Sequence, residues 1–171
     1  MNLMKKPVST IQIKKLLDPI LILFFAIYAV IFSLGRWGGS KPVLLIDPSG
    51  DAGALLSYAA ALDHPQFFAN DQILNPQNQM FSYNGIYLPF IRFAGSAVGD
   101  YGLGFLILLP VCIFLQLTSF YLFGKAIFHN RFWAVLLSAI SAVPIVYGFW
   151  DSCGLAYDPL PRFLFQSIFP F

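Results

Sequence analysis

The chain has 171 residues, of which 58% are hydrophobic and only 11% are charged, and its mean hydropathy is +0.71. A soluble domain carries about 25% charged residues, so this composition argues against an ordinary water-soluble domain and favours a membrane protein. The net charge is +2, which gives no indication of a nucleic-acid partner. All of the eight acidic residues are aspartates, and we expect them in loops and helix caps, because helix surfaces normally use glutamate freely.

Three uncharged apolar segments occupy residues 19–35, 103–124 and 132–150. Each is long enough to cross a hydrocarbon core of about 30 Å as a helix. Pro110 and Pro144 lie inside the second and third segments, but proline is tolerated in membrane helices, since neighbouring groups satisfy the backbone groups that it frees. We therefore expect an all-α, polytopic membrane protein with three transmembrane helices. We expect the first span to stay uncleaved, because its apolar core is longer than that of a signal peptide.

The basic residues predict how these spans are oriented. Six of the ten Lys and Arg residues lie in the tail 1–18 and in the short link 125–131. The positive-inside rule places both segments in the cytoplasm, so the long loop 36–102 and the tail 151–171 face outward. The expected location is the plasma (inner) membrane, with a cytoplasmic N-terminus. Seven of the eight aspartates fall on the outer side, and only Asp18 does not.

The outer loop is expected to contain two short amphipathic helices that lie on the membrane surface. Apolar residues recur at helical spacing between Asp51 and Asp63, and Pro65 disfavours helix at His64. The segment 86–102 predicts the second helix, with Arg92 on its polar side.

Asp51 is the leading candidate for chemistry. A carboxylate at a membrane surface can deprotonate a hydroxyl group or bind a divalent cation, and group transfer from a phosphate-linked donor requires one or the other. The alternative is that Asp51 is only the N-cap of its helix, a position at which aspartate is favoured.

Other residues of the outer side carry hypotheses that each have a structural alternative. Asp151 and Asp158 follow the third segment and would complete a metal site with Asp51, or they are turn residues. Arg92 and Arg162 are candidate phosphate ligands, because guanidinium groups pair well with phosphate oxygens; alternatively, they extend along the interface to reach water.

Three further aspartates and the two cysteines also have a functional and a structural interpretation. Asp47 and Asp71 are either second acids or turn residues, and Asp63 with His64 is either half of a metal site or a surface pair. Both cysteines are expected to be packing residues. The sequence contains no HExxH, CxxC, GxSxG, P-loop or GxGxxG motif, and no predicted span has an ionisable residue at its middle, which argues against an ion-coupled pore.

The order of these features resembles the N-terminal part of the GT-C superfamily of integral-membrane glycosyltransferases, which use polyprenyl-phosphate-linked sugars. Those proteins begin with one span and a large outer loop, in which an early acidic residue precedes a Tyr- and Ala-rich helix. The stretch GDAGALLSYAAAL is similar to that loop start, and WDSCGLAYD supplies acids to the next outer segment. The chain departs from the family in having Ala52 where a second acid is usual and in having fewer spans.

This resemblance implies specific roles. Asp51 would be the general base or a metal ligand, together with Asp151 and Asp158, and the cofactor would be a divalent cation, Mg or Mn. Tyr58 would join the two arginines in binding a polyprenyl-phosphate sugar.

Two functions stay open at this point. The chain is the N-terminal fragment of a membrane glycosyltransferase that transfers a sugar from a lipid-phosphate donor on the outer face, and it needs further membrane helices to be active. Alternatively, it is a small non-enzymatic membrane scaffold or assembly subunit, whose outer loop docks a partner through aromatic residues. The lipid bilayer is a partner in both cases.

Overall fold

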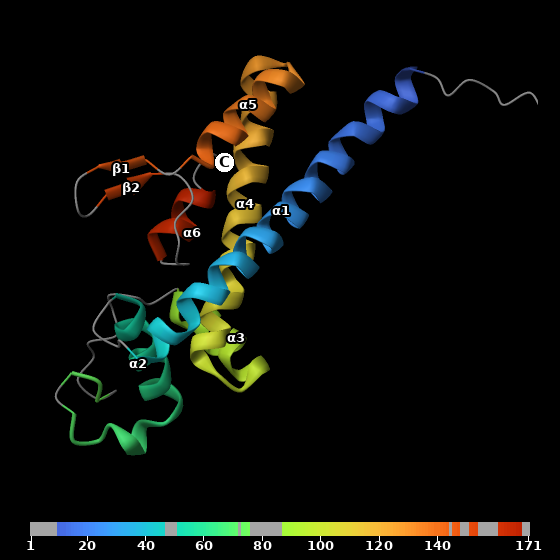
Figure 1. Cartoon of the computed structure of the whole chain (residues 1–171). Helices are drawn as coiled ribbons and strands as arrows, with labels where there is room; N and C mark the ends of the chain where they lie inside the picture. The colour runs from blue at the N-terminus through green and yellow to red at the C-terminus, as the bar shows by residue number, and fades with distance from the viewer. Residues whose placement is uncertain are drawn as a thin grey trace, which may run out of the picture.

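The structure is a computed structural model that describes residues 10–46, 51–71, 73–75, 87–143, 145–147, 151–153 and 161–168 (Figure 1). Within these ranges the chain is helical apart from one short pair of strands, which confirms the all-α class. The elements in chain order are α1 (Thr10–Ile46), α2 (Asp51–Asp63), a 3-10 turn (Pro65–Phe67), α3 (Tyr87–Val98), α4 (Tyr101–Phe128), α5 (Arg131–Ser141), β1 (Ile145–Tyr147), β2 (Asp151–Cys153) and α6 (Pro161–Ile168).

Among the described residues, two helices, α1 and α4, are long and apolar enough to cross a membrane. The apolar segment of α1 is Leu16–Gly35, and that of α4 is the whole helix. In Figure 1 the two helices cross obliquely. The α1 helix extends past the Gly-rich stretch after residue 35, at which the sequence predicted an end. The indole nitrogen of Trp37 donates a hydrogen bond to the carbonyl of Leu106 (3.1 Å), so contact with α4 supports this extension.

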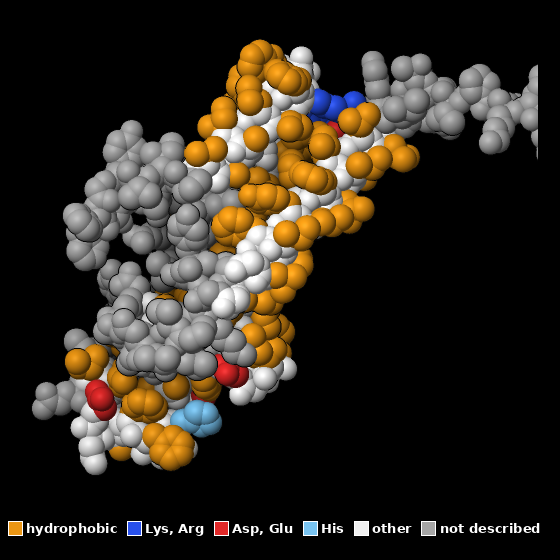
Figure 2. Space-filling model, in the orientation of Figure 1, with side chains coloured by type: hydrophobic (Ala, Val, Ile, Leu, Met, Phe, Trp, Pro, Cys, Tyr) orange, Lys and Arg blue, Asp and Glu red, His pale blue; other side chains and the backbone are white. Residues whose placement is uncertain are grey.

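The outward face of α1 is apolar. Figure 2 shows hydrophobic side chains along α1 and α5, and many large ones on α1 are exposed: Leu16, Ile20, Leu23, Phe24, Ile27, Val30, Ile31 and Leu34. Monomeric soluble proteins rarely expose contiguous apolar patches of this kind. Contact with lipid would cover this surface.

The third expected span is wrong. The α5 helix ends after 11 residues, or about 16 Å at 1.5 Å per residue, which is about half of a hydrocarbon core. The next described residues form an antiparallel pair in which Val146 faces Ser152. Pro144 in the sequence accounts for the stop, because proline biases the preceding residue away from helix. The β-branched residues Ile145 and Val146 then favour a strand.

The α5 helix folds back tightly on α4. His129 ends α4 in a left-handed conformation (φ 51°), and the side chain of Asn130 caps α5 by accepting a hydrogen bond from the Phe132 amide. A methyl group on Gly124 would lie 2.8 Å from the Cα of Ala134, so the two backbones are in direct contact. These helices share one hydrophobic core with α1: Phe25, Ala29, Leu109, Cys112, Ile113, Leu117, Tyr121 and Ala134.

A second core joins the two short helices to the start of α4. Its buried members are Leu55, Ala59, Tyr87, Leu88, Ile91 and Phe105. Both helices were predicted, but α2 has no charged residue between Asp51 and Asp63, so it lacks the polar face of an amphipathic helix. Its apolar surface packs against α3, which is amphipathic, as Leu88 and Ile91 are buried and Ser96 is exposed.

Candidate functional site

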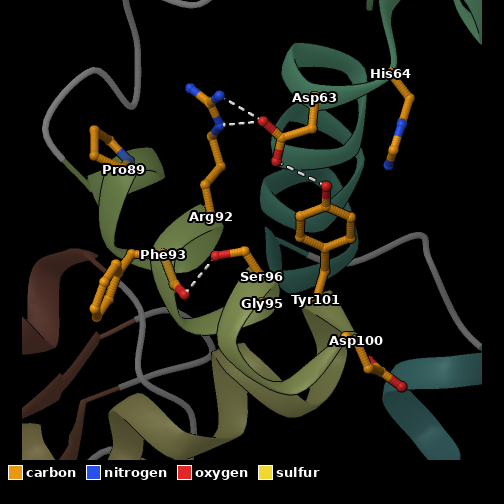
Figure 3. A pocket seen from close by; sticks show the side chains of 10 residues that line it. Asp63, His64, Pro89, Arg92, Phe93, Gly95, Ser96, Asp100 and Tyr101 are labelled. Carbon is orange, nitrogen blue, oxygen red and sulfur yellow. Dashed lines mark hydrogen bonds and ion pairs between the residues drawn. The ribbon is translucent and has the colours of Figure 1, made fainter.

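An open pocket of about 600 Å³ lies where the end of α2 meets α3 and the start of α4 (Figure 3). Small-molecule sites occupy about 300–1,000 Å³, and the volume of this pocket lies within that range. Tyr101, the first residue of the candidate span α4, is part of the wall, which places the pocket at the end of that span. The lining residues are Asp63, His64, Pro89, Arg92, Phe93, Gly95, Ser96, Gly99, Asp100 and Tyr101.

Asp63 is the centre of the polar contacts in this pocket. The Nε of Arg92 donates a hydrogen bond to Asp63 Oδ1 (2.7 Å), and the Tyr101 hydroxyl donates one to Oδ2 (2.7 Å). The Nη2 of Arg92 also pairs with Oδ1, and Figure 3 shows all three side chains converging from three helices. Asp63 is the last residue of α2, where the helix dipole disfavours a carboxylate. Its two partners compensate for that repulsion.

These contacts fix the charge of the carboxyl group. The hydrogen bond from Arg92 lowers the pKa of Asp63 below its ordinary value; partial burial opposes this shift, and the Tyr101 hydroxyl adds to it. Asp63 is therefore ionised at neutral pH, and it can accept hydrogen bonds but not donate them.

Close contact between two glycines sets the shape of the pocket. A methyl group on Gly104 of α4 would lie 2.4 Å from the backbone nitrogen of Gly95 on α3, so only glycine allows this approach. The connection between α3 and α4 is also short. Gly99 adopts a positive φ of 72°, and Asp100 caps α4 by accepting a hydrogen bond from the Leu103 amide (2.9 Å). Asp100 therefore has a structural role.

The pocket offers hydrogen-bond donors, hydrogen-bond acceptors and an apolar surface. The Arg92 side chain is 41% exposed and that of Asp63 is 23% exposed, so both reach solvent while paired. A guanidinium group donates to phosphate or hydroxyl oxygens, and a carboxylate accepts from hydroxyl groups. His64 is exposed beside Tyr101, with ring centroids 6.4 Å apart, and Phe93 is 76% exposed. Such a pocket suits a ligand that combines phosphate or hydroxyl groups with apolar parts.

The residues predicted from the sequence are not all in this pocket. Arg92 lines it. Asp51 is the first residue of α2 and Asp63 is the last, so a helix of about 20 Å separates Asp51 from the pocket. The side chain of Asp51 lies outside the described part of the structure. Tyr58 is half-buried and packs against the core between α2 and α3.

The remaining predicted ligands cannot be placed against one another. Asp47 and Asp158 lie outside the described residues, and for Asp151 in β2 and Arg162 in α6 only the backbone is described. Among the side chains that are described, no group of three or more His, Cys, Asp or Glu could hold a metal ion. The roles of Asp51, Asp151 and Asp158 as metal ligands stay predictions.

A second charged cluster, which sequence reasoning missed, lies at the opposite end of α4. Asp18 on α1 accepts hydrogen bonds at Oδ1 from the Tyr121 hydroxyl (2.6 Å) and Arg131 Nε (2.8 Å), and at Oδ2 from Lys125 Nζ (2.7 Å). We refer to these four residues as the Asp18 cluster; it joins α1, α4 and α5. The sequence signal that could have indicated this cluster was Asp18 itself, a single acid at the edge of an apolar segment.

No protein-family model matches the chain, and comparisons with curated proteins and with solved structures also gave no match. Its function is therefore inferred from its own fold, in which two candidate membrane-spanning helices carry a polar pocket at one end and a charged cluster at the other.

Proposed function

We propose that the chain is the N-terminal part of a membrane glycosyltransferase and that its pocket binds a lipid-phosphate sugar at the outer membrane surface. One observation carries this proposal: the pocket is lined both by the first residue of a candidate span, Tyr101, and by a partly exposed cation, Arg92. The phosphate of a membrane-anchored donor lies at the same level as the end of a span. A small pocket with a cation at that level suits such a donor.

Each group in the pocket has a role in this proposal. Arg92 donates hydrogen bonds to the phosphate, and its pairing with Asp63 holds the guanidinium in place before the donor arrives, which reduces the entropy lost on binding. His64 and the Tyr101 hydroxyl face the sugar, and Phe93 contacts the first part of the lipid chain. Transfer breaks the bond between the sugar and the phosphate and forms one to an acceptor hydroxyl.

The base that takes the acceptor proton must lie within hydrogen-bond reach of that hydroxyl. Asp51 begins α2, whereas Asp63, which pairs with Arg92, ends it, so we do not assign Asp51 a part in binding the donor phosphate. The pocket supports donor binding alone. The role of Asp51 as base, or as a ligand of Mg or Mn, rests on the resemblance and is tested separately, since an Asp51→Asn variant that keeps full transferase activity would remove it.

Binding of a radiolabelled polyprenyl-phosphate hexose to the full chain in lipid nanodiscs tests the proposal. We expect saturable binding that Arg92→Gln weakens by about 10- to 100-fold, the effect of losing a hydrogen bond to a charged group. Arg36→Gln, which removes a positive charge from the sequence of α1, is the matched control and should bind as the wild type does. Because Arg92→Gln also breaks the pair with Asp63, Ser96→Leu provides a second variant, which fills the pocket without removing a charge. Equal binding by all three variants would refute the assignment.

One observation fits the second candidate, an assembly subunit, as well as the first. The amide of Gln116, near the middle of α4, donates a hydrogen bond to the carbonyl of Ser141, the last residue of α5 (2.7 Å). Ser119 donates in the same region to the carbonyl of Ser167 in α6 (2.6 Å). The α5 helix thus ends halfway along a candidate span. Non-helical backbone at that depth is tolerated only where protein or a water-filled cavity shields it from lipid.

Further membrane helices, from a partner or from a longer chain, would provide that shield. The binding experiment separates the two candidates. If the wild type binds no donor and Arg92→Gln lowers only the thermal stability, the pocket is a structural junction between helices. The scaffold function is then favoured.

A further inference from the structure

The Asp18 cluster lies at the far end of both candidate spans from the pocket. Asp18 is two residues inside the apolar segment that begins at Leu16, and Lys125 is three residues before the end of α4. Figure 2 shows Lys and Arg side chains grouped beside α1 at the upper end of the molecule. If the two helices cross a membrane, the cluster lies among the lipid headgroups.

Cations outnumber the acid in this region. Lys125 and Arg131 both pair with the single carboxylate of Asp18, which leaves one positive charge in excess. Lys14 and Lys15 lie four and three residues before Asp18 in the sequence of α1. Across residues 1–18 and 125–131, six basic residues accompany one acid.

We propose that the Asp18 cluster binds the phosphate of an anionic phospholipid headgroup. Phosphate oxygens accept hydrogen bonds from both ammonium and guanidinium groups. The side chains of Lys125 and Arg131 are about one-third exposed while they pair with Asp18, so a lipid phosphate can approach them from the headgroup region. Asp18 and Tyr121 hold the cations in position, and the excess charge attracts the anion.

A cluster that binds lipid phosphate and a purely structural ion pair should respond differently to anionic lipid. A lipid phosphate and the Asp18 carboxylate are anions that interact with the same two cations, so an anionic lipid can replace part of what Asp18 contributes. Replacing Asp18 by Asn leaves Lys125 and Arg131 adjacent and without the carboxylate, and like charges repel. Anionic lipid should then relieve the repulsion, whereas neutral lipid should not.

The experiment compares nanodiscs of phosphatidylcholine alone with nanodiscs that also contain phosphatidylglycerol. Native mass spectrometry of the full chain counts retained lipids, and we expect wild type to retain phosphatidylglycerol about fivefold more than Lys125→Gln does, a factor typical of one basic residue at an anionic surface. Arg36→Gln, at the other end of the α1 span, is the control and should retain as much as wild type.

The Asp18→Asn variant provides the decisive comparison. We expect its thermal midpoint to fall below that of wild type in phosphatidylcholine and to recover in phosphatidylglycerol. An equal fall in both lipids, with no loss of lipid retention in Lys125→Gln, would overturn the proposal and leave the cluster as an ion pair between helices. Inorganic phosphate added to phosphatidylcholine discs distinguishes the source of the anion: recovery by free phosphate, without retention of phosphatidylglycerol, would overturn the lipid assignment.

Discussion

Replacing Gly104 by alanine tests how closely α3 and α4 are held together at the pocket. The added methyl group would lie 2.4 Å from the nitrogen of Gly95, 2.6 Å from its Cα and 2.7 Å from the carbonyl carbon of Ala94. Non-bonded carbon atoms pack best at about 3.5–4.0 Å, so α3 must move away from α4 by about 1 Å. All three contacts are with backbone atoms, and no side chain can rotate to make room.

The expected loss of stability follows from two opposing effects. Overpacking of a tight contact costs about 1–3 kcal/mol, and alanine favours helix over glycine by about 1 kcal/mol. The contacts at Gly104 are very short, so the first effect should prevail and leave a net loss of about 1–2 kcal/mol. In a domain of this size a loss of 1 kcal/mol lowers the thermal midpoint by about 2–4 °C, so the midpoint should fall by about 2–8 °C.

Gly35→Ala provides the matched control. Nothing lies within 4 Å of a methyl group at Gly35, so this variant gains helix propensity without a clash, and its midpoint should stay constant or rise. Thermal unfolding of both variants in nanodiscs, followed by circular dichroism, measures the difference. A Gly104→Ala protein as stable as Gly35→Ala would refute the close approach of α3 to α4 and, with it, the described shape of the pocket.

Three further outcomes are expected. Arg92 lowers the pKa of Asp63, so this pair stabilises the fold at pH values above the usual carboxyl pKa of about 3.9. The stabilisation is lost as the pH falls through the lower pKa of the folded state. The thermal midpoint of wild type should therefore fall more steeply than that of Asp63→Asn when the pH is lowered through this range. Tyr101→Phe removes one hydrogen bond from Asp63 and should cost about 1 kcal/mol in chemical unfolding, and an unchanged value would contradict that contact. Gly124→Ala places a methyl group 2.8 Å from the Cα of Ala134, so it should also lower the midpoint, whereas a rise would show that α5 does not pack closely on α4.

Local sequence patterns were sufficient to predict most helices but not their ends. Proline and the turn residues around it bound α2 correctly at Asp63, because they act on the backbone within a few residues. The end of α1 was predicted too early, since its continuation depends on the contact of Trp37 with Leu106, 69 residues away. The run after Arg131 was read as a full span, because apolar composition alone does not distinguish one long helix from a half-length helix followed by strands.

The candidate site was harder to predict for the same reason. Asp63 and Arg92 were each noted, but they are 29 residues apart, and their pairing depends on how α2 packs against α3. Tyr101 was not noted, because nothing in its local sequence distinguishes it from other aromatic residues near a span. Asp18 is paired with residues more than 100 positions away, and no local pattern indicates such partners.

The most direct test of the central claim asks on which side of the membrane the two polar ends lie. Ser96 lines the pocket and His129 ends α4, and both are exposed. Each is replaced by cysteine in a Cys153→Ser background, in which the buried Cys112 should not react, and intact right-side-out vesicles are treated with a membrane-impermeant maleimide. We predict that Ser96→Cys is labelled from outside and that His129→Cys is labelled only after permeabilisation. Labelling of both from the same side would contradict a pocket and a charged cluster at opposite faces of one membrane.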